Sequence, residues 1–189
     1  MIGDDFAAVL TAAQHGDEAA FARLWHDGHP ALLRYLRVTM PSGAEDIAAE
    51  TWVQVVRGLA KFRGDEQNWR AWLFTTARRR VVDQTRHQAR RPAASLDALP
   101  DLVLAEVPGL RGPDTADIAL ENLDTRAAIA VISCLPPLQA EVIMLRVVAG
   151  LDTERVARLL GRTPGAIRIA SHRGLQRLGI MLAGDGVTR

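Results

Sequence analysis

Apolar positions recur at helical spacing along most of this chain. Four of them precede Gly16 at intervals of three or four residues: Phe6, Val9, Leu10 and Ala13. Asp17 is placed to cap a second helix, in which we expect Gly28 and Pro30 to make a break before the apolar run resumes at Leu32. No stretch alternates between apolar and polar residues over a useful length. The pattern therefore predicts an all-α fold.

The next predicted helix, over residues 44–62, has an acidic outer face. Its inward positions are apolar: Ile47, Trp52, Val55, Leu59 and Phe62. Its outward positions carry the carboxylates of Glu45, Asp46 and Glu50. From the residues alone, a solvated acidic face and a protein-docking face are equal alternatives.

A second charged helix follows the polar loop 63–68 and ends at Pro92. Residues 70–91 contain seven arginines and one acid, Asp83. Trp69, Trp72 and Phe74 stand beside these arginines, and interleaved aromatic and basic residues suit single-stranded nucleic acid. The alternative is that the aromatics are core and only the arginines are exposed. We expect one or two aromatics in the core and Trp69, at the helix start, to be exposed.

Prolines and acids mark a boundary between two helical parts. Residues 92–113 contain four prolines, which no continuous helix accommodates, and residues 92–125 contain seven acids and a single arginine. The sequence therefore predicts two small helical domains, 1–91 and 114–182, joined by a flexible acidic linker over 92–113, with a tail at 183–189. Because the linker offers little apolar surface, we expect the free domains to move independently.

The second part contains two short helices joined by a tight turn. Asp152 is placed to cap the first and Gly161 to end it in a left-handed conformation; Thr163 and Pro164 then start the second. The second helix turns one set of residues inward: Ile167, Ser171, Gly174 and Leu178. It leaves another set outward: Arg168, Ile169, His172, Arg173 and Gln176. Residues 151–178 hold six arginines and two acids. This is the pattern of a helix-turn-helix, whose second helix enters the DNA major groove, although a solvated helical hairpin is an alternative.

Composition excludes several classes of function. The five histidines form no set with metal-ligand spacing, and neither a phosphate-binding glycine loop nor a nucleophile motif occurs, so we expect no metal, no cofactor and no enzyme. The lone Cys134 is expected to be a buried structural thiol. No apolar stretch approaches the length of a membrane span, and Asp4 and Asp5 argue against a signal peptide, which together predict a cytoplasmic protein without membrane insertion.

Three separated motifs resemble an extracytoplasmic-function (ECF) sigma factor, the small two-domain group of bacterial sigma factors. They are AEDIAAETW, then NWRAWLFTTARRRVVDQTRHQARR, then LPPLQAEVIMLRVVAGLDTERVARLLGRTPGAIRIASHRGLQRL. The resemblance covers most of the chain, from about Gly16 to Leu182. The resemblance implies a protein that binds core RNA polymerase and directs promoter-specific initiation of transcription. It also implies that the two halves correspond to sigma regions 2 and 4.

The resemblance assigns a role to each candidate site. The polymerase-docking residues are Glu45, Asp46, Ala49, Glu50 and Trp52, where Ala49 replaces the glutamine of many members. The residues that melt and capture the minus-ten promoter element as a single strand are Arg63, Asn68, Trp69, Arg70, Arg79, Arg80, Asp83 and Arg86. Those that read the minus-35 element as duplex are Arg162, Thr163, Arg168, Ile169, His172 and Arg173.

Other implications concern partners and the linker. The acidic linker corresponds to the segment that threads the polymerase channel, and an anti-sigma factor is an expected partner beside promoter DNA and core polymerase. In the recognition helix, Ile169 and Ala170 stand where polar or basic residues are usual, which favours phosphate contacts and shape readout. The alternative function is a stand-alone helix-turn-helix regulator that does not dock on polymerase.

Overall fold

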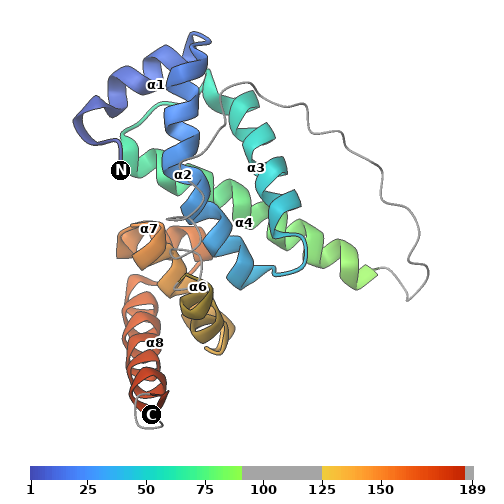
Figure 1. The fold of residues 1–189 in the computed structure, drawn as a ribbon, viewed down its shortest axis with the longest axis vertical. Helices are drawn as coiled ribbons and strands as arrows, with labels where there is room; N and C mark the ends of the chain where they lie inside the picture. The colour runs from blue at the N-terminus through green and yellow to red at the C-terminus, as the bar shows by residue number, and fades with distance from the viewer. Residues whose placement is uncertain (91–124, 186–189) are drawn as a thin grey trace.

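The computed structural model describes residues 1–90 and 125–185, and within these ranges it contains helices and no strand. The predicted linker over 92–113 and the first residues of the predicted second domain lie outside them. None of the helices in the described ranges is long and apolar enough to cross a bilayer. Figure 1 shows the helices of the N-terminal part in blue to green and those of the C-terminal part in gold to red.

The N-terminal part consists of a short 3-10 turn, Gly3–Asp5, and four helices: α1 (Phe6–Gln14), α2 (Glu18–Thr39), α3 (Ala44–Leu59) and α4 (Glu66–Arg90). The predicted apolar face of α1 is confirmed, because all four of its residues are buried. Asp17 caps α2 as predicted, its carboxylate accepting a hydrogen bond from the Ala20 amide at 2.8 Å.

Helix α2 runs without a break through Pro30, so the predicted interruption there is wrong. A proline inside a helix removes one hydrogen bond, but on α2 the apolar residues before and after it lie on one fully buried face that includes Leu24, Leu32 and Leu36. Gly28 is no breaker either. A Cβ at this position would lie 2.9 Å from Leu73 Cδ2, so glycine lets α2 approach α4 closely.

Helix α4 begins at Glu66, inside the stretch that we expected to be a loop. The Asn68 amide donates to Asp65 Oδ1 at 2.7 Å, and the Trp69 amide donates to the Asp65 carbonyl at 2.9 Å. Asp65 therefore acts as the helix cap. The earlier start matters for function, because it places Trp69 within the first turn of the helix.

The C-terminal part begins with helical residues 125–133 and continues with α6 (Pro137–Ile143), a π-helical turn η2 (Met144–Val148), α7 (Thr153–Leu160) and α8 (Pro164–Asp185). Helices α6 and α8 pack closely, since a Cβ on Gly174 would lie 2.6 Å from Ile143 Cδ1. Cys134 is exposed, so the prediction that its thiol is buried is wrong. In the helical residues 125–133 that precede it, Ile129 and Ile132 are half-buried instead.

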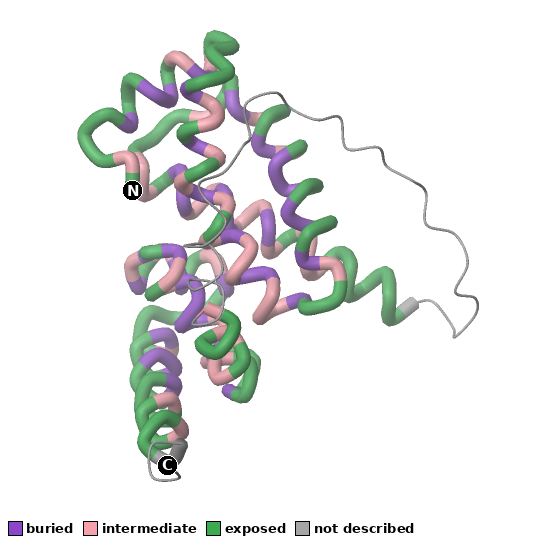
Figure 2. The backbone as a smooth tube through the Cα atoms, in the orientation of Figure 1, coloured by how far each residue is buried: buried purple, intermediate pink, exposed green. Residues whose placement is uncertain are grey.

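The two parts pack against each other, which differs from the expected independent domains. Helix α2 contacts both α6 and η2, and α4 contacts α7. Residues of both parts belong to one buried cluster, among them Tyr35 and Phe74 from the first and Met144 and Leu145 from the second. Figure 2 shows the buried positions continuing along the facing helices, while much of α8 is exposed. The apolar surface that holds the parts together comes from the described helices of both parts.

Candidate nucleic-acid interface

The predicted helix-turn-helix is confirmed in its local geometry. The Asp152 carboxylate accepts from the Arg155 amide at 2.7 Å, and Gly161 ends α7 in the left-handed region with φ of 63°. The Thr163 hydroxyl accepts from the Ala166 amide at 3.2 Å and starts α8, with Pro164 as its first residue. Each of these features depends on neighbours within a few residues.

The outer face of α8 and the turn before it carry the predicted duplex-reading residues. All six are exposed: Arg162, Thr163, Arg168, Ile169, His172 and Arg173. The side chain of Arg168 is 64% exposed and pairs with Glu154 at 3.3 Å. Ala170 is buried together with Ile167, so the absence of a polar group at Ala170 takes nothing from the outer face.

The cap at Asp152 provides a test of the turn. We expect Asp152→Ala to lower the free energy of unfolding by about 0.5–2 kcal/mol, because the α7 amide loses its acceptor. Asp152→Asn should retain most of that stability.

Hydrogen bonds from Arg155, first from its amide, lower the pKa of the Asp152 carboxyl. The benefit of the charged form is therefore present at neutral pH and is lost as the pH falls through this lowered pKa. Urea unfolding at several pH values, with Asp152→Asn as the pH-insensitive control, measures it; equal stability of both variants would contradict the cap.

The predicted single-strand residues on and before α4 divide into an exposed and a buried group. The exposed residues are Arg63, Asn68, Arg79, Asp83 and Arg86, and Arg80 is half-buried. Trp69 is 1% exposed, so the expectation that it is the exposed aromatic is wrong. Its ring packs against Phe6, Phe62 and Trp72, at centroid distances of 6.4, 5.6 and 5.5 Å.

Arg70 is also buried and serves the packing of the protein. Its Nη2 lies 2.9 Å from Asp27 Oδ2, and its Nη1 donates to the Ala149 carbonyl at 3.3 Å. The guanidinium thereby joins α4 to α2 and to the end of η2. A direct contact of Arg70 with DNA is incompatible with this burial.

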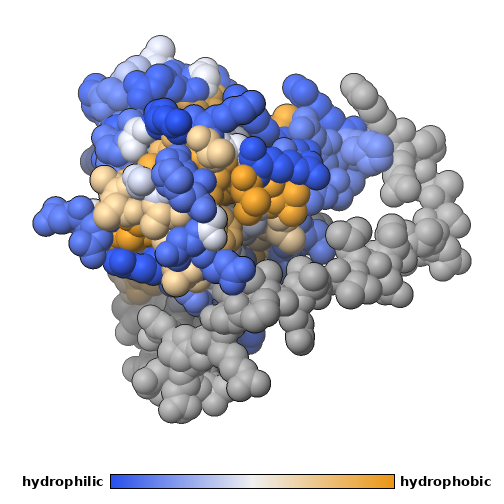
Figure 3. Space-filling model, turned by 90° about the horizontal axis from the view of Figure 1, so that it is seen from above, coloured by the Kyte–Doolittle hydropathy of each residue, from blue (hydrophilic) through white to orange (hydrophobic). Residues whose placement is uncertain are grey.

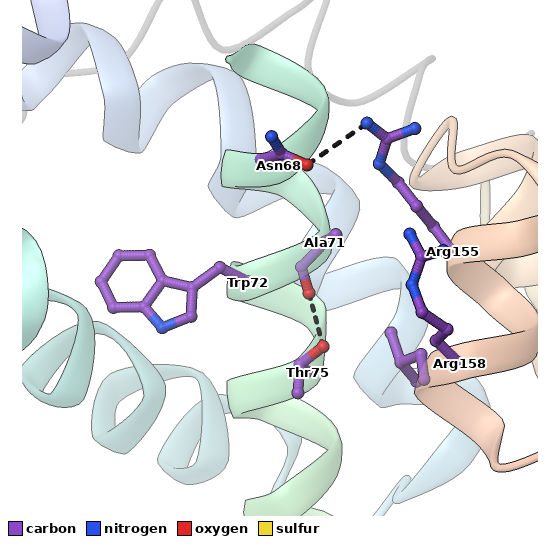
Figure 4. Close-up of a pocket in the computed structure, with 7 residues that line it drawn as sticks. Asn68, Ala71, Trp72, Thr75, Arg155 and Arg158 are labelled. Atoms are coloured by element: carbon purple, nitrogen blue, oxygen red, sulfur yellow. Dashed lines mark hydrogen bonds between the residues drawn. The ribbon is translucent and has the colours of Figure 1, made fainter. Parts of the chain in front are cut away.

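A cavity of about 360 Å³ lies between α4 and α7 (Figure 4). It is lined by Asn68, Ala71, Trp72 and Thr75 from α4 and by Arg155, Arg158 and Leu159 from α7. Trp72 is half-buried and stacks on Phe62, with ring centroids 5.1 Å apart and planes 20° apart. The Arg155 Nη2 donates to Asn68 Oδ1 at 3.2 Å across the cavity mouth. Sequence spacing within α4 gave no sign of this cavity, because three of its seven lining residues come from α7.

Helix α3 presents the predicted acidic face, with Glu45, Asp46, Ala49 and Glu50 all exposed. Trp52 is 7% exposed, and its Nε1 donates to His29 Nδ1 at 3.2 Å. Burial is the main cause that lowers the pKa of His29, which keeps the ring neutral and able to accept this bond. Trp52 is therefore a core residue and offers no surface contact.

Two exposed valines on α3 were missed by the sequence analysis. The side chains of Val53 and Val56 are 47% and 54% exposed. With Ala49 and Ala60, which are also exposed, they repeat at helical spacing and form an apolar stripe beside the acids. The helical spacing of these four apolar residues on the same face as the acids was the signal in the sequence that indicates the stripe. Figure 3 shows apolar side chains gathered in patches between hydrophilic ones on the face seen from above.

The fold and this site define a class: a helical protein with a helix-turn-helix in one part and, in the other, a basic helix beside an acidic, partly apolar helix. Family models for Sigma-70 region 2 and for Sigma-70 region 4 match residues 24–91 and 125–178. The chain is 32% identical to the ECF RNA polymerase sigma factor SigD of Mycobacterium tuberculosis, over 98% of this chain and 88% of that protein. The chain belongs to the ECF RNA polymerase sigma factors.

Other proteins agree with this assignment. The ECF RNA polymerase sigma factor ShbA of Streptomyces griseus is 34% identical, over 93% of this chain and 96% of its own. Two solved structures share the fold. CnrH in complex with the cytosolic domain of CnrY has a TM-score of 0.61 at 20% identity, covering 96% of this chain and 99% of that one. The sigma factor RpoE of Bartonella quintana, in complex with the anti-sigma factor NepR, has a TM-score of 0.60 at 22% identity, covering 89% and 98%.

Proposed function

We propose that this protein docks on core RNA polymerase through α3 and directs initiation by reading the minus-35 element as duplex and the minus-ten element as a melted single strand. The observation that carries the proposal is the exposed basic face at the start of α8, on a correctly capped helix-turn-helix. The match to region 2 over 24–91 disfavours a stand-alone regulator, which would leave the N-terminal part without a role.

The α8 face supports a division between base and phosphate contacts. Arg168 lies one turn into the helix with an exposed side chain, so its planar fork suits a base edge, above all guanine. Ile169 and His172 flank it on the same face. Arg173 lies nearer the edge of that face and suits a phosphate.

We expect Arg168→Ala to weaken binding to the best upstream element by about 1–3 kcal/mol and to relax preference at one base pair. Arg173→Ala should weaken all sequences alike and lower the slope of log affinity against log salt by about one. Binding titrations at several salt concentrations, on the best element and on single-base variants of it, measure both effects. Identical sequence profiles and salt slopes for the two variants would overturn the division.

The capture of the minus-ten element is proposed for fewer residues than the sequence predicted. Arg63, just before α4, and Asn68, in its first turn, are exposed and suit a flipped-out base. Arg79, Asp83 and Arg86 continue along the helix. With Trp69 in the core, Trp72 is an aromatic residue of α4 that keeps part of its surface exposed. We therefore transfer the proposed base stacking from Trp69 to Trp72.

The α3 face is proposed as the polymerase-docking surface. An apolar stripe bordered by carboxylates fits a basic, partly apolar helical partner, because the stripe buries apolar area and the acids set orientation. Arg37 pairs with Glu45 at 3.1 Å, and the pKa of the Glu45 carboxyl is lowered by a hydrogen bond from its own backbone amide and by Arg37. The acid is therefore ionised when a partner approaches.

An anti-sigma factor is a proposed partner as well. One structure that shares the fold is the sigma factor RpoE in complex with the anti-sigma factor NepR. The direct test of the proposed function is run-off transcription by core polymerase with this protein on a library of random promoters. Enrichment of a two-part promoter would support it, and transcripts no different from those of core polymerase alone would refute it.

A further inference from the structure

One ion pair joins the two helices of the helix-turn-helix on its outer side. Helices α7 and α8 pack together (Figure 1), and Arg168 Nη2 on α8 lies 3.3 Å from Glu154 Oε1 on α7. The two residues are 14 positions apart, on either side of the turn at Gly161. Their side chains are 64% and 56% exposed, so the carboxylate lies at the surface beside the arginine to which we assign the base contact.

Glu154 differs in its contacts from Asp152, the other acid of residues 151–178. The Asp152 carboxylate accepts from the Arg155 amide at 2.7 Å and pairs with the Arg155 guanidinium, so it is occupied by the cap of α7. The carboxylate of Glu154 reaches across to α8 instead. A negative charge in the first turn also suits the dipole of α7, but that effect needs no contact with Arg168. The contact between the helices is therefore a feature that a role in stability leaves unexplained.

The chemistry of guanine recognition gives this contact a use. An arginine reads guanine with two parallel donors, which must lie in the plane of the base. The side chain of arginine is long and has many rotamers, so an unsupported guanidinium is poorly oriented. A carboxylate that holds one edge of the guanidinium restricts its plane. Because the guanidinium has five N–H donors, donors remain for the base.

The charge of Glu154 has a second consequence at the same surface. DNA presents phosphates at every sequence, and they repel a nearby carboxylate whether or not the correct base is present. The favourable contact of Arg168 offsets this repulsion only where a guanine is within reach. An acid beside a reading arginine therefore lowers the affinity for all duplexes and raises the ratio of affinities between correct and incorrect ones.

We propose that Glu154 is a specificity-determining residue of this protein: it positions the Arg168 guanidinium for a base edge and repels duplexes that lack that base. The inference rests on the proposed function for the contact of Arg168 with a base. In water, an exposed ion pair contributes little to stability because solvent screens it. Bound DNA excludes that solvent, so the effect of Glu154 is expected in binding preference and not in folding.

Two substitutions separate the hydrogen bond of this carboxylate from its charge. Glu154→Ala removes both, whereas Glu154→Gln removes the charge and keeps an oxygen that accepts from Arg168. Glu18→Ala is the matched control, because Glu18 is exposed and lies in the first turn of α2, directly after the cap Asp17. It removes a first-turn carboxylate from a helix outside the helix-turn-helix.

Selection from a pool of random-sequence duplexes measures the binding preference. The full-length protein is mixed with the pool, bound and unbound strands are sequenced, and Arg168→Ala identifies the base pair that Arg168 reads. At that base pair we expect Glu154→Ala to lower the preference at least about threefold, Glu154→Gln to lower it less, and Glu18→Ala to leave it unchanged. With Arg168→Ala already present, Glu154→Ala should cause no further loss of preference. Titration of the whole fluorescent pool should show about two- to threefold tighter binding for both Glu154 variants and none for Glu18→Ala.

The outcomes distinguish this inference from the proposed function. A relaxed preference in Arg168→Ala with the parental preference in Glu154→Ala would overturn the positioning role and leave the proposed base contact standing. An equal loss in Glu154→Gln and Glu154→Ala would overturn the hydrogen bond as the cause. Equal affinities of Glu154→Ala and Glu18→Ala for the pool would overturn the repulsion. If Arg168→Ala changed no preference, the base contact of the proposed function would be refuted, and the positioning role with it.

Discussion

Trp69→Ala is expected to lower the free energy of unfolding by about 3–5 kcal/mol, the range for a large aromatic removed from a packed core. The ring is 1% exposed and lies among Phe6, Phe62 and Trp72, so its loss leaves a cavity between α1 and α4. Urea unfolding followed by circular dichroism measures the change. A defect of Trp69→Ala in promoter opening would then follow from this lost stability, without loss of a stacking contact.

Trp69→Phe is the matched control. No acceptor among the described residues lies within hydrogen-bond distance of Trp69 Nε1, so the indole N–H contributes no bond that phenylalanine would lose. We therefore expect Trp69→Phe to be clearly more stable than Trp69→Ala. Trp72→Ala, at a half-buried ring, should also be less damaging to stability. A stability loss below about 1 kcal/mol for Trp69→Ala would contradict the buried position, because surface substitutions typically have effects of that size or less.

The double variant Val53→Asp with Val56→Asp is expected to lose at least about 2 kcal/mol of affinity for core RNA polymerase, about thirtyfold in dissociation constant. Both side chains lie at the centre of the exposed stripe of α3, where docking would bury the new carboxylates without a partner. Folding should be little affected, because the two valines are already about half exposed to water. A fluorescence titration of labelled protein with core polymerase measures the loss.

Val147→Asp is the control for this surface. Val147 is 65% exposed and belongs to η2 in the C-terminal part, so it receives the same substitution away from α3. We expect its affinity for polymerase to be close to that of the parent. If Val147→Asp and the α3 variant bound equally well, α3 would not be the docking face.

The exposed stripe on α3 shows why part of the site was missed. The docking residues, among them Glu45, Glu50 and Trp52, were assigned from the family resemblance. The register of Trp52 on the helix placed it inward, as the apolar pattern of the same helix already indicated. Helical position predicted the burial of Trp52 correctly, whereas the resemblance included this buried residue among the docking residues.

The sequence by itself determined the features that depend on close neighbours. The caps at Asp17, Asp152 and Thr163, the left-handed Gly161 and the two faces of α8 all follow from interactions within one or two turns, and all are present in the structure. Their energies are local, so the residues involved are readable from their spacing.

Only the tertiary structure decided the features that depend on distant residues. Pro30 stays within α2 because that helix is buried on one side against other helices, and Trp69 is core because Phe6 and Phe62 meet it from other parts of the chain. The contact of Glu141 with Tyr35 joins residues 106 positions apart. Packing between such distant segments closes the two parts on one another, and no local pattern of either segment specifies its partner.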